Sequence, residues 1–263
     1  QDLGNLRQGM VSIYLAQALA NNHIVVRGSL ERARDFLYVS DLVDIWAAIL
    51  SRQHCSVVQG IGRNSPNEFG GQKNWIFTPC DLTDLAAVDS LEFQAGEHTI
   101  LVNNAGTLGP VAQSENATAE EINACMLLNV TAPMRLTARF LKEVEGEKQV
   151  YFTGSGAAQY SIAGWSAYCA SKAAIHMYAE VAAQEYPDVA IHAFKPGKVD
   201  TPMQAQIRNT TSEDFPSVSH FIEEYESGNL VDPNTVAERL LYVIEAQDKP
   251  SVVFPISQIN PLS

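Results

Sequence analysis

Apolar and polar positions follow two alternating patterns along the chain. Short apolar runs bounded by polar or glycine-containing turns are typical of strands that are buried on both faces of a sheet. They occur at residues 23–28, 36–39, 55–63, 74–84, 98–106, 148–156, 189–197 and 251–256. Apolar residues at helical spacing occur at residues 9–21, 42–52, 118–144, 164–186, 221–230 and 232–246. This alternation predicts an α/β fold, with a Rossmann-like doubly wound parallel sheet in a single domain.

Composition and charge narrow the class of protein. The chain has 263 residues, of which 46% are hydrophobic, and this is enough for one large core. A formal net charge of −13 disfavours nucleic acid and anionic membranes as partners. No apolar run is long enough to span a membrane. Four cysteines without paired spacing indicate a reduced, cytoplasmic protein, and we expect no metal site.

The strongest candidate for chemistry is a group of hydroxyl and amine side chains. Tyr168 and Lys172 are four residues apart on a predicted helix, so both side chains leave from one face. A phenol has an ordinary pKa of about 10, and a cation one turn away would stabilise the phenolate and lower that pKa. Ser155 follows a predicted strand end and could hold a carbonyl oxygen while Tyr168 donates a proton. Asn129, polar within an apolar helix pattern, could carry a water that relays protons to Lys172.

Further motifs in the same order separate this group from a chance surface pair of tyrosine and lysine. Asn-Asn-Ala-Gly stands at 103–106 and Pro-Gly at 196–197. Together, these residues resemble the short-chain dehydrogenase/reductase family over roughly residues 52–256. The resemblance implies a catalytic tetrad of Asn129, Ser155, Tyr168 and Lys172. It also implies cofactor contacts from Asp81, Leu82, Asn104, Ala105, Gly106, Tyr168, Lys172, Pro196, Gly197, Val199 and Thr201.

Two stretches narrow the resemblance within that family. "GWSAYCASKAA" and "GNLVDPNTVAERLL" are most similar to sepiapterin-reductase-type carbonyl reductases. The aspartate with which those enzymes anchor a pterin has no clear match in the tail "FPISQINPLS". The resemblance therefore implies reduction of a small carbonyl compound, or oxidation of the alcohol, without pointing to a pterin.

The choice of cofactor depends on Arg63, at the end of the predicted strand 55–63. At this place the family binds the NAD ribose hydroxyl with an acid and the NADP phosphate with an arginine. "GIGRN" contains an arginine and no acid, so NADP(H) is favoured and NAD(H) stays possible. The alternative is a solvated arginine at a strand end.

The first turn of the expected nucleotide-binding unit lacks its glycines. The family's Thr-Gly-x-x-x-Gly-x-Gly lets the backbone approach a pyrophosphate at a helix N-terminus. After "FLYV" (36–39), the sequence instead has Ser40-Asp41-Leu42-Val43-Asp44, which adds carboxylates and β-branched bulk. We expect "FLYVSDLVDIW" to take the place of the first strand, turn and helix, and NADPH affinity to be low.

Residues 1–50 resemble the C-terminal part of nucleotide-sugar epimerases and dehydratases that use NAD, an extended branch of the same superfamily. We expect residues 1–35 to form an arm of one helix and one strand, at the sheet edge or across a neighbouring subunit. Residues 36–263 would form the Rossmann-like reductase domain. Epimerase activity is disfavoured because this piece carries none of that family's catalytic residues.

Two functions remain open on the sequence. The intact tetrad favours an NADP(H)-dependent carbonyl reductase or alcohol dehydrogenase, and the absent glycines favour a non-catalytic scaffold with a reductase fold. In either case the family's paired long helices imply a homodimer or homotetramer. Ala173, Ala174, Tyr178 and Ala182 would give helix 164–186 a face for close packing, unless that face is buried within the protomer.

Overall fold

The computed structural model describes residues 12–14, 23–28, 57–63, 75–246 and 249–260. Its strands are β1 Ser12–Tyr14, β2 His23–Gly28, β3 Val57–Gly62, β4 Trp75–Pro79, β5 His98–Asn103, β6 Glu147–Thr153, β7 Ala190–Lys195 and β8 Val253–Pro255. Its α-helices are α2 Leu85–Asp89, α3 Ala119–Met126, α4 Ala132–Glu143, α5 Ser166–Glu185, α6 Pro202–Arg208, α7 Val218–Glu226 and α8 Pro233–Glu245. The predicted alternation of strands and helices is thus confirmed for most of the chain.

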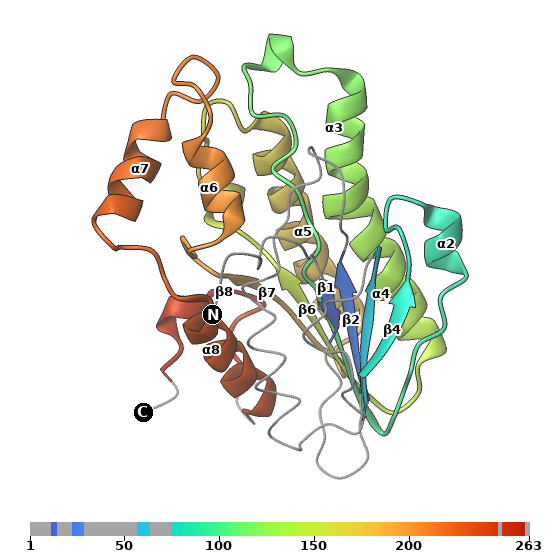
Figure 1. The fold of residues 1–263 in the computed structure, drawn as a ribbon. Helices are drawn as coiled ribbons and strands as arrows, with labels where there is room; N and C mark the ends of the chain where they lie inside the picture. Colours follow the sequence, from blue (N-terminus) through green and yellow to red (C-terminus); the bar gives the residue numbers. More distant parts are fainter. Residues whose placement is uncertain (1–11, 15–22, 29–56, 64–74, 247–248, 261–263) are drawn as a thin grey trace, which may run out of the picture.

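The strands form one sheet with helices on both faces (Figure 1). Its order is β4-β3-β1-β2-β5-β6-β7-β8, with a further parallel pairing between β2 and β3. β1 runs antiparallel to β2 and β3, and the other pairings are parallel. This arrangement is the predicted Rossmann-like doubly wound sheet.

The core has two layers because successive residues of a buried strand point to opposite faces. In β5, Ile100 and Val102 pack in one cluster with residues of α8, whereas Leu101 packs in another with residues of α4 and α5. In β6, Tyr151 joins the α8 side and Phe152 the opposite side. Strands that are apolar at every position therefore need helices on both faces, which is why their sequences read as continuous apolar runs.

The parallel register brings the candidate site together at the carboxyl ends of neighbouring strands. Asn103 pairs with Phe152, and Thr153 pairs with Phe194, so β5, β6 and β7 end side by side. The residues that follow these strands lie where open α/β sheets bind ligands.

The N-terminal part differs from the expectation. Residues 12–14 form a strand, not part of a helix over 9–21, because Ile13 and Tyr14 suit strand pairing and tertiary contacts override helical spacing. β2 lies inside the sheet beside β5, not at its edge, and it holds the place that we assigned to residues 36–39. The β-branched run of β2 suits that central position. Residues 36–39, the turn Ser40–Asp44 and the boundary between 35 and 36 lie outside the described residues.

The long helix predicted over 118–144 is interrupted. α3 begins with a capping box between Thr118 and Glu121, and α4 follows a π-helical segment at Leu127–Thr131. Pro133 explains the interruption, since its ring would clash with the carbonyl of Asn129 and it has no N–H to donate there. The π segment thus falls at the polar residue that the sequence singled out.

Candidate active site

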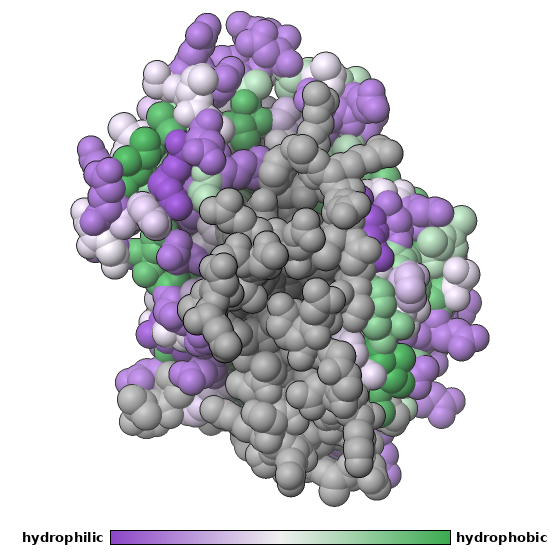
Figure 2. All heavy atoms as spheres, in the orientation of Figure 1, coloured by the Kyte–Doolittle hydropathy of each residue, from purple (hydrophilic) through white to green (hydrophobic). Residues whose placement is uncertain are grey.

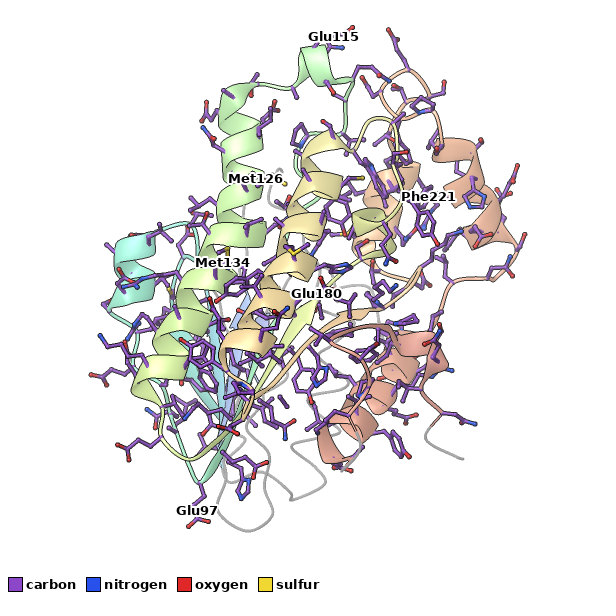
Figure 3. The ribbon with its side chains drawn as sticks, turned by 180° about the vertical axis from the view of Figure 1, so that it is seen from behind. Glu97, Glu115, Met126, Met134, Glu180 and Phe221 are labelled. Carbon is purple, nitrogen blue, oxygen red and sulfur yellow. The ribbon has the colours of Figure 1, made fainter. Side chains whose placement is uncertain are left out.

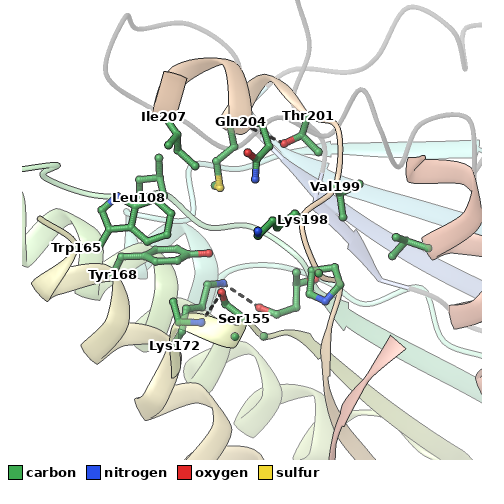
Figure 4. A pocket seen from close by; sticks show the side chains of 18 of the residues that line it. Leu108, Ser155, Trp165, Tyr168, Lys172, Lys198, Val199, Thr201, Gln204 and Ile207 are labelled. Carbon is green, nitrogen blue, oxygen red and sulfur yellow. Dashed lines mark hydrogen bonds between the residues drawn. The ribbon is translucent and has the colours of Figure 1, made fainter. Parts of the chain in front are cut away.

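A cavity of about 390 Å³ opens at the carboxyl ends of β6 and β7. Tyr168, Ser155 and Lys172, the residues that the sequence singled out, line it together (Figure 4). The predicted cofactor residues Asn104, Pro196, Gly197, Val199 and Thr201 line the same cavity. Most of its remaining wall is apolar and comes from the loops after β5 and β6, from the residue before α5, and from α6, α7 and α8.

Helix α5 places both of its reactive side chains on its buried face. Tyr168 is 7% exposed and Lys172 4%. Nζ of Lys172 donates a hydrogen bond of 2.9 Å to the carbonyl of Thr153 at the end of β6, and it lies 5.7 Å from the centroid of the Tyr168 ring. The ammonium group is thus anchored to the sheet beneath the phenol.

Burial sets the protonation of this pair. Removal from water raises the pKa of Tyr168 to about 12, and a hydrogen bond with the Ser155 hydroxyl offsets part of that rise. The same burial lowers the pKa of Lys172 to about 8. The expectation that the tyrosine pKa lies below its ordinary value is therefore wrong for the protein alone, because desolvation is the largest influence on it and raises it. Tyr168 holds its proton at neutral pH.

Ser155 is held by a histidine that the sequence analysis missed. Its backbone N–H donates to Nε2 of His176 at 3.3 Å, and its hydroxyl accepts from the N–H of Ala157 at 3.1 Å. His176 follows Lys172 by four residues, so Tyr168, Lys172 and His176 form one row along α5. The four-residue spacing from Lys172 could have indicated from the sequence that His176 lies on the same face of the helix. A Cβ at Gly154 would collide with Nε2 of His176, so the glycine allows β6 to approach α5 closely.

Asn129 fixes the loop that follows β5. Its Oδ1 accepts from the N–H of Thr107 at 2.7 Å, and its Nδ2 donates to the carbonyl of Thr107 at 2.8 Å and to the Ser171 hydroxyl at 2.9 Å. The side-chain amide is thus engaged with the loop and α5. A Cβ at Gly106 would lie 2.9 Å from Oδ1 of Asn129 and 3.4 Å from Nζ of Lys172, which shows how closely this loop passes the lysine.

The other predicted cofactor residues also lie at or just beyond the carboxyl ends of the parallel strands. Asn104 accepts a hydrogen bond of 2.7 Å from the Thr153 hydroxyl, and Ala105 follows it in the loop. Asp81 accepts from the N–H and hydroxyl of Thr83, just beyond β4, with Leu82 buried beside it. Arg63 comes directly after β3. Arg63, Asp81, Leu82, Ala105 and Gly106 do not line the cavity.

The residues at the carboxyl ends of these strands fit the nicotinamide end of a dinucleotide. The cavity combines the neutral phenol of Tyr168 with the buried ammonium group of Lys172, and Asn104, Pro196 and Gly197 line it beside them. The pyrophosphate turn expected at Ser40–Asp44 lies outside the described residues, so the fit concerns only this end.

Comparison with known proteins gives the family. A model of the short chain dehydrogenase family matches residues 51–212, and the chain belongs to that family. A second model, the NAD dependent epimerase/dehydratase family, matches residues 4–60. Both resemblances inferred from the sequence are thereby confirmed.

Curated relatives and solved structures are consistent with this assignment. A benzil reductase ((S)-benzoin forming) of Bacillus cereus is 37% identical over 67% of this chain and 77% of its own length. A sepiapterin reductase of Xenopus laevis is 30% identical over 72% of this chain and 76% of its own. A short-chain dehydrogenase/reductase structure from Saccharomyces cerevisiae superposes with a TM-score of 0.71 at 25% identity, covering 83% of this chain and 92% of that one.

The buried His176 makes stability depend on pH. Burial, with Lys172 and Lys195 nearby, lowers its pKa to about 4 from the ordinary 6.5. Below pH 6.5 the unfolded chain takes up a proton that the folded protein does not, so the free energy of unfolding falls as the pH drops from 6.5 towards 4. The upper bound for this one group is about 3 kcal/mol.

We expect His176→Gln to keep an acceptor for the Ser155 N–H and to reduce this acid-dependent loss, measured by urea unfolding at several pH values. Burial also lowers the pKa of His192 to about 4, so part of the acid-dependent loss of stability should remain in this variant. Exposed His220 serves as the control through His220→Gln. If the variant at 176 loses as much stability as the wild type on acidification, the buried, neutral state of His176 is wrong.

Proposed function

We propose that this protein is an NADP(H)-dependent carbonyl reductase that uses Tyr168 as its general acid. The observation that carries the proposal is the group formed by the half-buried Ser155 and the buried Tyr168 and Lys172 at one wall of an apolar cavity. Membership of an oxidoreductase family supports it, as do relatives that are named as reductases of carbonyl compounds.

Each residue of the site has a distinct role in this proposal. The Ser155 hydroxyl holds the substrate's carbonyl oxygen beside Tyr168. When bound, the reduced nicotinamide supplies the hydride to the carbonyl carbon. Tyr168 then gives its proton to the developing alkoxide, and the Lys172 ammonium group stabilises the resulting phenolate.

Asn129 and Lys172 would return the proton to Tyr168. The side chain of Asn129 is engaged with Thr107 and Ser171, so a relay water would bind to its backbone carbonyl. Pro133 cannot donate to that carbonyl, which supports this role. The sequence assigned Asn129 a relay water without naming the atom that holds it, and we propose its backbone carbonyl.

The proposed substrate is a bulky, largely apolar carbonyl compound. Trp165 stacks on Phe215 with ring centroids 4.8 Å apart, and Phe221 packs against both rings. Trp165 and Phe221 also line the cavity. Such walls favour aromatic substituents. Benzil, after which the Bacillus relatives are named, is an aromatic diketone of this kind.

A non-catalytic scaffold remains the alternative. The sequence feature that favours it is the absence of the family's Thr-Gly-x-x-x-Gly-x-Gly motif. The two proposals differ in whether the protein binds a reduced dinucleotide and turns over a ketone.

A reducing, cytoplasmic setting fits the proposal. Cys125 and Cys169 carry free thiols, and hydrophilic residues cover most of the coloured surface in Figure 2. Among the described residues, no helix combines the length and apolarity needed to cross a membrane. With a net charge of −13, small molecules are better partners than nucleic acid.

Replacing the proposed acid tests the chemistry. Tyr168→Phe removes the proton donor and keeps the ring, so we expect ketone turnover to fall about 10²–10⁴-fold while NADPH binding persists. Turnover is followed by loss of NADPH absorbance with benzil as substrate. Tyr186→Phe, at the exposed C-terminal end of α5, is the matched control. Unchanged turnover in Tyr168→Phe would contradict the proposed acid.

The preference for NADP(H) over NAD(H) depends on Arg63. Arg63→Leu removes a charge at the end of β3, and a charge-assisted bond to phosphate is worth roughly 1.5–3 kcal/mol. We expect the ratio of NADH to NADPH dissociation constants to fall at least about tenfold, with NADH binding nearly unchanged. Arg135→Leu, a surface arginine that pairs with Asp89, is the control. Equal losses for both cofactors would assign Arg63 a structural role.

We also propose that the outer face of α4 and α5 joins copies of the chain in a homodimer or homotetramer. The two helices lie side by side, linked by the Tyr178 hydroxyl and the Met134 carbonyl (Figure 3). Ala182 is buried against the sheet, so its predicted place on the interface is wrong. Met177 and Val181 are apolar residues on this face, and their exposed fractions are 60% and 42%.

Charge on that face should separate the subunits. We expect Met177→Glu to lower the mass measured by light scattering at micromolar concentration, because it buries a carboxylate in each interface. Tyr242→Glu, an exposed position on α8, should leave the mass unchanged. A wild-type monomer under these conditions would rule out the proposal.

A further inference from the structure

Gln204 brings an unpaired polar atom into the cavity. It stands on α6, where the Thr201 hydroxyl caps the helix by accepting from the Gln204 N–H at 3.4 Å. Gln204 is 7% exposed, and its Oε1 has no hydrogen-bond partner among the described residues. Figure 4 shows the side chain pointing from α6 into the cavity that Tyr168 and Ser155 also line.

A buried acceptor without a partner is unfavourable, because it has lost its bonds to water and gained none. Its neighbours in the cavity wall include Met203 and Ile207, which offer no donor. Lys198 also lines the cavity, but its Nζ is bound to Nε2 of His220 at 2.8 Å and to Glu224 at 3.0 Å. A ligand with a donor group would therefore complete the site.

The position of the substrate's carbonyl group limits which part of the substrate can donate to Gln204. In the proposed function, the substrate's carbonyl oxygen lies against Ser155 and Tyr168. Gln204 lines the same cavity from α6, so we place the donor for its Oε1 on another part of the same substrate. The aromatic wall of Trp165 and Phe221 is left for an apolar substituent.

We propose that Gln204 determines specificity by accepting a hydrogen bond from a hydroxyl group of the substrate, so that the preferred substrates are apolar hydroxy ketones. This inference rests on the proposed function and adds a substrate class to it. A site built to bond a hydroxyl discriminates against analogues that lack it, because the buried acceptor then stays unpaired, so benzil would be turned over less efficiently than a hydroxy ketone of similar size. A methyl group of similar size gains no such bond.

A matched pair of ketones tests the inference. 2-Hydroxyacetophenone and propiophenone differ by a hydroxyl in place of a methyl group. We expect Gln204→Met to lower the ratio of their kcat/KM values, hydroxyl over methyl, by about tenfold relative to wild type. Comparing ratios between proteins cancels the intrinsic difference in reactivity. Gln204→Glu keeps an acceptor and should retain the preference for the hydroxyl.

Binding measurements separate failure of this inference from failure of the proposed function. Dissociation constants of both ketones, measured by calorimetry with NADPH present, should show the same change in ratio even if the wild type turns over neither ketone. An unchanged binding ratio in Gln204→Met would overturn the inference. Equal losses for both ketones together with weaker NADPH binding would also overturn it, because Gln204 would then hold the cofactor.

Discussion

The candidate site depends on one contact between helix and sheet, the hydrogen bond from the buried Lys172 ammonium group to the carbonyl of Thr153. It fixes α5 against the end of β6, and the four-residue step of the helix then places Tyr168 on one side of the lysine and His176 on the other. His176 holds the backbone of Ser155. One row of side chains thus sets the position of the phenol, the cation and the serine.

Burial gives this row its chemistry as well as its geometry. It keeps the Tyr168 proton in place at neutral pH and lowers the Lys172 pKa to about 8, so both groups can change charge when a ligand alters their surroundings. Glycines at 106 and 154 allow the neighbouring backbone to come close. The same packing leaves Oε1 of Gln204 as a buried acceptor within the cavity.

Much of this arrangement could be predicted from the sequence, because strands that are buried on both faces and residues four apart on a helix leave clear patterns. Ser155, Tyr168 and Lys172 were found in that way. His176 and Gln204 were missed, since a polar residue on a buried face gives little signal until the packing is known. The raised pKa of Tyr168 depends on burial, which spacing does not reveal. The strand at Ser12–Tyr14 and the central place of β2 depend on pairing with distant strands.

The central claim is that the row on α5 forms a working cofactor and proton-donating site. Calorimetric titration of NADPH into the wild type and Lys172→Ala tests it most directly. We predict saturable binding to the wild type, and a dissociation constant at least about tenfold weaker in the variant, in line with the loss of a charge-assisted contact. No binding to the wild type, or equal binding to both proteins, would contradict the account.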